Sequence, residues 1–146
     1  MNLLNKLQAE SDKMENTKEE IITEIKNDFS EYINTKFENF LERNIGDEAK
    51  QKREYTLFYD FWEYTPGCSK TRFYIAGWQW YNKEVPDYSY EQDFYKGFKL
   101  KDIHEEVIAQ CLNVLKDFLE TNGFHHRVIS EHNRFKELKG EVVISW

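Results

Sequence analysis

The histidines are the side chains that could hold a metal ion, and three of the four lie close together in the sequence. His125, His126 and His132 fall within and just after a segment with the composition of a β-strand. Across a hairpin, side chains of neighbouring strands come close enough to share a metal ion. Successive residues of one strand point to opposite faces, however, which separates His125 from His126. The sequence therefore predicts no metal site.

The fourth histidine stands beside two carboxylates at the start of an expected helix. The sequence His104-Glu105-Glu106 is similar to the beginning of a metalloprotease helix, in which another histidine follows one turn later. That position is occupied by Ile108, so the zinc-binding pair is incomplete. A histidine next to a carboxylate can transfer protons, but most such histidines at helix starts have no catalytic role.

The remaining candidates for chemistry are a cysteine and a pair of carboxylates. Cys68 lies in a turn-like stretch, and only Lys70 and Arg72 nearby could activate its thiol. Asp60 and Glu63 are three residues apart in an expected strand, so they lie on opposite faces and cannot act together in hydrolysis. We expect them to meet Lys70 or Arg72 across a hairpin instead. The sequence thus predicts no catalytic residue and no cofactor, and favours a protein that is not an enzyme.

Aromatic side chains exceed an ordinary composition, at 16% of the residues. Large rings that carry a polar group suit both buried packing and recognition surfaces. Two interpretations stay open, because the rings either form the core beneath amphipathic helices or contact a partner protein. The candidate partner-binding residues are Trp62, Tyr64, Tyr74, Trp78, Trp80, Tyr81, Tyr88 and Tyr90.

Other binding functions remain as alternatives. A pocket that sequesters a small molecule or a nucleotide needs convergent polar groups, which Arg72, Gln79 and Asn82 could supply. Single-stranded nucleic acid needs basic residues between the rings, and residues 55–100 offer 5 basic against 6 acidic side chains. A small metal-dependent hydrolase that uses His104 or His126 is the further alternative.

Charge and hydropathy narrow the class of protein. The formal net charge of −7 disfavours nucleic acid as a partner and suits recognition of a basic protein. Charged residues interrupt residues 1–14, so they lack the apolar run of a signal peptide, and no segment reaches the length of a membrane span. Two cysteines do not make a disulfide framework. We expect a cytoplasmic protein with reduced thiols.

Hydrophobic periodicity predicts the N-terminal elements of one domain over residues 1–146. Residues 1–16 fit a short amphipathic helix or a frayed end. Thr17 with Glu20 is a capping-box pattern that begins a long helix over residues 17–44. Asn44 and Gly46 are expected to end this helix. Its wide apolar stripe also suits a homodimer.

The rest of the sequence predicts an α+β fold. Residues 55–80 indicate an aromatic hairpin with strands 55–64 and 71–80, and residues 81–100 indicate a long loop. Within residues 101–146 we expect a helix over 102–122, capped by Asp102, and strands over 125–130 and 141–146. Asn122-Gly123 should end the helix, with Phe124 folded back on its last turn. The prediction is a long N-terminal helix and a second amphipathic helix packed on a small antiparallel sheet of four strands.

The C-terminal third resembles a recurring pattern in small phage-encoded or prophage-encoded proteins. In that pattern a helix ends in Gly-Phe or Gly-Tyr and a strand, a turn and a final Ile-Ser-Trp follow, here Gly123-Phe124 and Ile144-Ser145-Trp146 within residues 103–146. The resemblance implies a phage setting, in which small acidic proteins are often accessory factors or inhibitors that bind a host or phage protein. We therefore expect a protein-binding accessory or inhibitor, for example of a host defence system, in the host cell cytoplasm.

Overall fold

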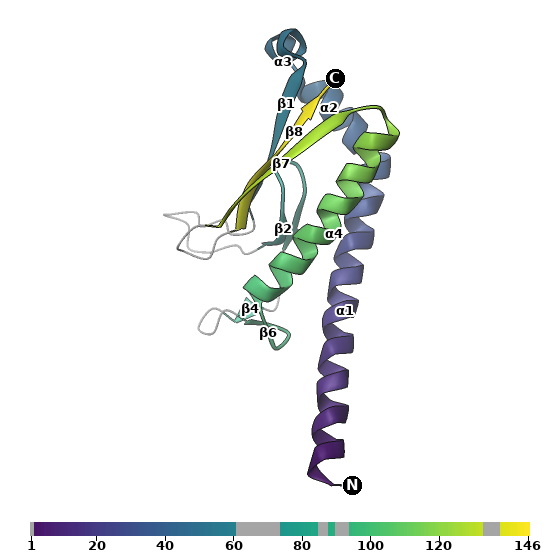
Figure 1. Cartoon of the computed structure of the whole chain (residues 1–146), viewed down its shortest axis with the longest axis vertical. Helices are drawn as coiled ribbons and strands as arrows, with labels where there is room; N and C mark the ends of the chain where they lie inside the picture. Colours follow the sequence, from purple (N-terminus) through teal and green to yellow (C-terminus); the bar gives the residue numbers. More distant parts are fainter. Residues whose placement is uncertain (1, 61–73, 85–87, 90–93, 133–137) are drawn as a thin grey trace.

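The computed structural model describes residues 2–60, 74–84, 88–89, 94–132 and 138–146. Within them the chain has the predicted α+β architecture, in which helices pack on one face of a small antiparallel sheet (Figure 1). The buried side chains of helices and strands form one hydrophobic cluster, which includes Phe29 of the N-terminal helix, Leu115 of the C-terminal helix and Ile144 of the sheet.

The N-terminal helix is longer than predicted. Helix α1 spans Leu3–Thr35, and it begins at Asn2, whose side-chain oxygen accepts a hydrogen bond from the Asn5 amide at 2.9 Å. The predicted start at Thr17 is wrong, because Thr17 lies inside α1 and its hydroxyl donates to the Lys13 carbonyl. A hydroxyl bonded to the preceding turn of its own helix does not act as an N-cap.

Two shorter helices follow α1. The chain leaves α1 at Lys36, and helix α2 (Phe37–Asn44) continues to the predicted end at Asn44, whose side-chain amide donates to the Phe40 carbonyl. Helix α3 (Asp47–Lys52) was not predicted, and Gly46 precedes it as the N-cap with an ordinary φ of −87°. Gly46 therefore starts a helix and does not provide the left-handed stop that the sequence suggested.

Helix α4 (Leu100–Thr121) confirms the predicted second helix and its ending. The Gly123 amide donates to the Glu120 carbonyl and the Phe124 amide to the Leu119 carbonyl, with Gly123 at a φ of +80°. This pair of hydrogen bonds defines the expected Schellman motif. The predicted cap at Asp102 is wrong, because α4 begins earlier, with Lys99 at the N-cap.

Helices α1 and α4 lie side by side and run in the same direction (Figure 1). Lys18, near the middle of α1, has its Nζ 2.5 Å from Oε1 of Glu106 in α4. Where α2 begins, the Phe37 ring contacts Phe118 of α4 with 5.4 Å between centroids. The other side of α4 contacts the strands, so α4 separates much of α1 from the sheet.

The main sheet has the strand order β1-β8-β7, and every neighbouring pair is antiparallel. Strand β1 is Glu54–Asp60, β7 is His125–His132 and β8 is Leu138–Ser145. Strand β1 therefore pairs with β8, near the end of the given sequence, and Leu57 lies opposite Val142. The hairpin turn over residues 65–67 lies outside the described residues.

The second half of the predicted hairpin belongs to a separate sheet. Strand β2 (Tyr74–Gly77) pairs with β3 (Asn82–Glu84), and it touches β1 through a single antiparallel bridge from Tyr59 to Trp78. The predicted four-stranded sheet is thus corrected to three strands plus this two-stranded ribbon. The expected loop over residues 81–100 holds β3 and the short strands β4 (Tyr88–Ser89), β5 (Phe94–Tyr95) and β6 (Phe98–Lys99).

Candidate functional site

The aromatic residues after β2 form a packed cluster against α1 and α2. Trp78 is 3% exposed and Tyr81 is 8% exposed, and the Phe29 ring lies 5.3 Å from each of their centroids. Both therefore belong to the core, which is one of the two interpretations that the sequence left open. Trp80 is half-buried, stacks on Tyr32 at 5.0 Å and lies 4.8 Å from Phe37. We call these rings, with Tyr59 and Phe40, the aromatic cluster.

For the other candidate aromatic residues the structure describes the backbone alone or nothing. Tyr74 lies in β2 and Tyr88 in β4, and the structure describes only their backbone. Trp62, Tyr64 and Tyr90 lie outside the described residues. Partner binding by the aromatic segment as a whole therefore stays a prediction.

One buried hydroxyl connects the aromatic cluster to the surface of α1. The Tyr81 hydroxyl donates a short hydrogen bond to Asp28 Oδ2. Burial raises the pKa of Tyr81 above its ordinary value, and the bond to the Asp28 carboxylate raises it further. Tyr81 is consequently protonated near neutral pH and acts as a fixed donor that joins the β2-β3 ribbon to α1.

In the described part of the chain, Cys111 and the histidines show no arrangement for chemistry, and Cys68 lies outside the described residues. Cys111 is buried in α4, and burial raises the pKa of its thiol to about 12, so it behaves as a small apolar side chain. His125 is exposed, whereas His126 lies on the opposite face of β7 with its Nε2 3.0 Å from Glu120 Oε1. His104 is buried within α4. Among described residues, no group of three His, Cys, Asp or Glu side chains could hold a metal ion.

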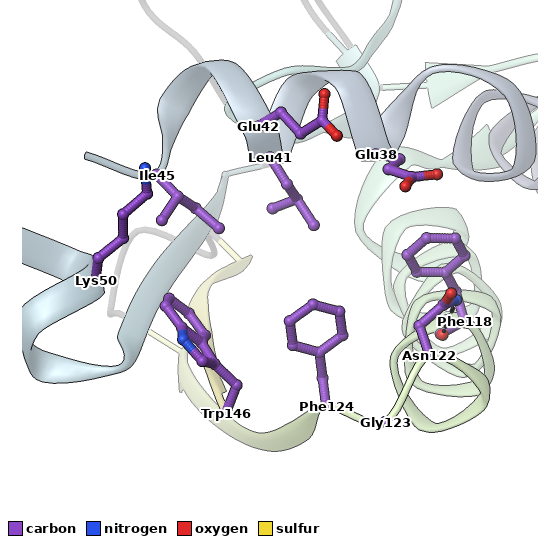
Figure 2. Close-up of a pocket in the computed structure, with 10 residues that line it drawn as sticks. All are labelled: Glu38, Leu41, Glu42, Ile45, Lys50, Phe118, Asn122, Gly123, Phe124 and Trp146. Atoms are coloured by element: carbon purple, nitrogen blue, oxygen red, sulfur yellow. Dashed lines mark hydrogen bonds between the residues drawn. The ribbon is translucent and has the colours of Figure 1, made fainter. Parts of the chain in front are cut away.

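A pocket of about 600 Å³ lies at one end of the molecule, where α2, the end of α4 and the C-terminus meet (Figure 2). We call it the end pocket. Its walls are apolar: Leu41 and Ile45 come from α2 and the residue after it, and Phe118 comes from α4. Phe124, just before β7, and Trp146, just after β8, come from the same end of the β7-β8 pair. Figure 2 shows the rings of Phe124 and Trp146 pointing toward the space beneath Leu41 and Ile45.

The polar groups of the end pocket stand at its rim. Glu38 and Glu42, one turn apart on α2, are exposed, and Lys50 of α3 is the basic residue among the lining side chains. Asn122 also lines the pocket, but its side-chain amide donates to the Phe118 carbonyl at 2.8 Å. This pocket was not predicted from the sequence. The sequence did contain a signal. Glu38 and Glu42 are four residues apart, and so are Leu41 and Ile45, which places the two acids and the two apolar residues on adjacent sides of one short helix.

A smaller cavity of about 320 Å³ lies between β1 and the β2-β3 ribbon. Gln79 and Asn82, two of the polar residues expected in a small-ligand pocket, line it together with Trp78. Arg72, the third of that set, lies outside the described residues. Asp60 also lines this cavity, and its carboxylate lies 3.9 Å from Lys139 of β8.

The first turns of α1 project beyond the start of α4 (Figure 1). They carry four exposed apolar side chains, Leu3, Leu4, Leu7 and Met14, whose exposed fractions are 69%, 62%, 50% and 53%. In a helix with about 100° between successive residues, these four lie on the same side as Ile21, Ile22 and Ile25, which are buried farther along α1. We call them the α1 stripe.

Comparisons with protein-family models, curated proteins and solved structures found no match to this chain. No helix in the described ranges is both long enough and apolar enough to cross a membrane.

Proposed function

We propose that this chain is a non-enzymatic binding protein, an accessory or inhibitory factor, that docks on a basic partner protein through the α1 stripe. The observation that supports this proposal is the continuation of the core-facing side of α1 past the point where the rest of the molecule covers it. Leu3, Leu4, Leu7 and Met14 extend the line of Ile21 and Ile25 for more than three helical turns.

Exposing a contiguous apolar stripe of this kind to water is unfavourable in free energy. Each Å² of apolar surface removed from water contributes about 25 cal/mol. Side chains that are at least half exposed would therefore still gain much of this free energy if a partner buried them. Single exposed apolar residues are ordinary, whereas contiguous exposed patches mark interaction sites. An amphipathic helix commonly docks by laying such a stripe in an apolar groove of its partner.

The charges beside the stripe indicate the kind of partner. Glu10 and Glu15 lie on its two sides, and both are exposed. Lys18 lies in line with the stripe, but its ammonium group is already paired with Glu106 of α4 at 2.5 Å. The partner therefore meets a stripe with an acidic residue on either side. Lysine or arginine residues flanking an apolar groove would complement it and speed association.

A second copy of the chain fits this stripe less well. In a parallel pair of α1 helices, Glu10 of one helix would lie opposite Glu15 of the other. In an antiparallel pair, each acidic flank would face the same flank of the second copy. Like charges across a helix seam are destabilising, so the charge pattern favours a different, basic protein over the homodimer that the sequence also suggested.

Site-specific cross-linking tests the proposal in the protein's own cells. A photoreactive benzophenone amino acid replaces Leu7 in the stripe, and a matched control carries it at Asn16, which is exposed on the opposite side of the same helix. We expect one protein adduct at Leu7 and none at Asn16. The cross-linked peptide of the partner should carry lysine or arginine beside the attachment site. E10K/E15K should lower the adduct yield at least about tenfold, because it places like charges across the interface.

Three results would contradict the proposal. One is the same adducts from both positions, which would indicate nonspecific collision. Another is the absence of an adduct at Leu7 when the protein is present at its natural level. The third is an adduct between two copies of the chain, which would make the stripe a dimer interface.

A further inference from the structure

Aromatic rings line the end pocket. The ring planes of Phe124 and Trp146 are 89° apart and their centroids are 6.3 Å apart, so the two rings form walls at right angles. Phe118 adds a third aromatic ring from α4. The face of an aromatic ring is electron-rich and attracts a cation, and sites that hold quaternary ammonium groups use several such faces.

The charges at the rim also favour a cation. Glu38 and Glu42 contribute two carboxylates against the single ammonium group of Lys50. The described residues include no hydrogen-bond or ion-pair partner for either carboxylate, so both are available to a ligand. An exposed ion pair contributes little by itself, so the rim charges add to the attraction that the aromatic rings supply.

The size and apolar wall of the end pocket indicate a small organic molecule. Its volume of about 600 Å³ lies within the range of roughly 300–1,000 Å³ that is usual for small-ligand sites. Ile45, which is half-buried, and the edge of Leu41 form an apolar wall, and a purely polar ligand would leave this wall uncovered.

We infer that the end pocket binds a small organic ammonium ion that carries an apolar group. The ammonium group contacts the faces of Phe124 and Trp146 near the carboxylates of Glu38 and Glu42, and the apolar group covers Leu41 and Ile45. This site is independent of the proposed protein-docking surface, because α2 and the end of α4, which line the end pocket, lie at the other end of the molecule from the first turns of α1 (Figure 1).

The test is a titration of the full chain with choline, followed by the chemical shifts of the Trp146 indole N–H and the Gly123 amide. The matched ligand is the neutral carbon isostere of choline, in which a tert-butyl group replaces the trimethylammonium group at nearly the same size. We expect choline to shift both signals with saturation, and the isostere to bind at least about fivefold more weakly because it lacks the cation–π attraction.

Two variants separate charge from shape at the same site. E38Q/E42Q should weaken choline binding at least about threefold, and its fold should be retained because both residues are exposed. K50Q, which removes the opposite rim charge, should leave choline binding equal or tighter. The inference is overturned if choline causes no saturable shift, if the isostere binds equally well, or if E38Q/E42Q binds choline as tightly as the unchanged protein. None of these outcomes affects the cross-linking result at Leu7.

Discussion

A single glycine fixes how the sheet packs on the aromatic cluster. Gly140 of β8 lies opposite Tyr59 of β1, and the Tyr59 ring crosses over it so that the hydroxyl reaches Ser130 Oγ at 2.8 Å. A Cβ at position 140 would lie 2.0 Å from the Tyr59 hydroxyl oxygen and 2.6 Å from the Ile129 carbonyl oxygen. Only glycine leaves room for this crossing.

Gly140→Ala should therefore destabilise the protein by about 2–3 kcal/mol, since overpacked positions typically cost this much. Urea unfolding followed by circular dichroism measures the difference. Gly46→Ala is the matched control, because nothing lies within 4 Å of its added Cβ, and it should cost less than about 1 kcal/mol. Equal losses for the two variants would show that the crossing of Tyr59 over Gly140 does not matter. Replacing Tyr59 should rescue Gly140→Ala only in part, because the Ile129 carbonyl remains.

Single residues also show where sequence-based prediction of the site reached its limit. Trp78 and Tyr81 were candidates for both core and surface, and the structure buries them against Phe29. Their side-chain type is compatible with both environments, because each ring has a large apolar area and a polar atom. Trp146 lines the end pocket and is 39% exposed, but the sequence indicated it only as the last residue of the motif Ile144-Ser145-Trp146. Its position depends on residues from α2 and α4, which no local pattern connects to it.

At the level of elements, helix ends were predicted where the signal is local. The stop at Asn122-Gly123-Phe124 depends on hydrogen bonds within six residues, so the sequence predicted it correctly. The start of α1 was misplaced because Thr17 has the composition of an N-cap while the apolar stripe continues through it to Leu3. The partner of β1 was missed for a different reason. A pairing with β8 joins residues that are far apart in the sequence, and periodicity carries no information on such pairings.

The end of α4 gives a prediction at this scale. Gly123 has a φ of +80°, in the region that favours glycine, so Gly123→Ala should destabilise the protein by about 1–2 kcal/mol. Gly123→Asn should cost less, because asparagine tolerates this backbone conformation better than alanine. Thermal unfolding of the two variants compares them directly. If alanine is tolerated as well as asparagine, the strain at this residue does not limit stability.

At the scale of the whole molecule, the predicted α+β class is confirmed, because it follows from the number and kind of amphipathic segments. The arrangement of the described strands into the sheet β1-β8-β7, the ribbon β2-β3 and a small sheet β4-β5-β6 did not follow from the sequence. The first turns of α1 lie at the other end of the molecule from α2 and the C-terminus (Figure 1), so each proposed binding surface can be altered without the other. This separation also means that the projecting part of α1 should be dispensable for folding.

Deletion of residues 2–14 tests that independence. Every residue from Asn2 to Met14 is exposed, and the first buried residue of α1 is Ile21. The truncated protein should lose helical signal but keep its free energy of unfolding within about 1 kcal/mol, because surface residues contribute little. Phe29→Ala, at a side chain with 0% exposure, should instead cost about 3–5 kcal/mol. A comparable loss on truncation would mean that the α1 stripe is covered by the protein itself in solution, and the docking surface proposed for a basic partner would then not exist.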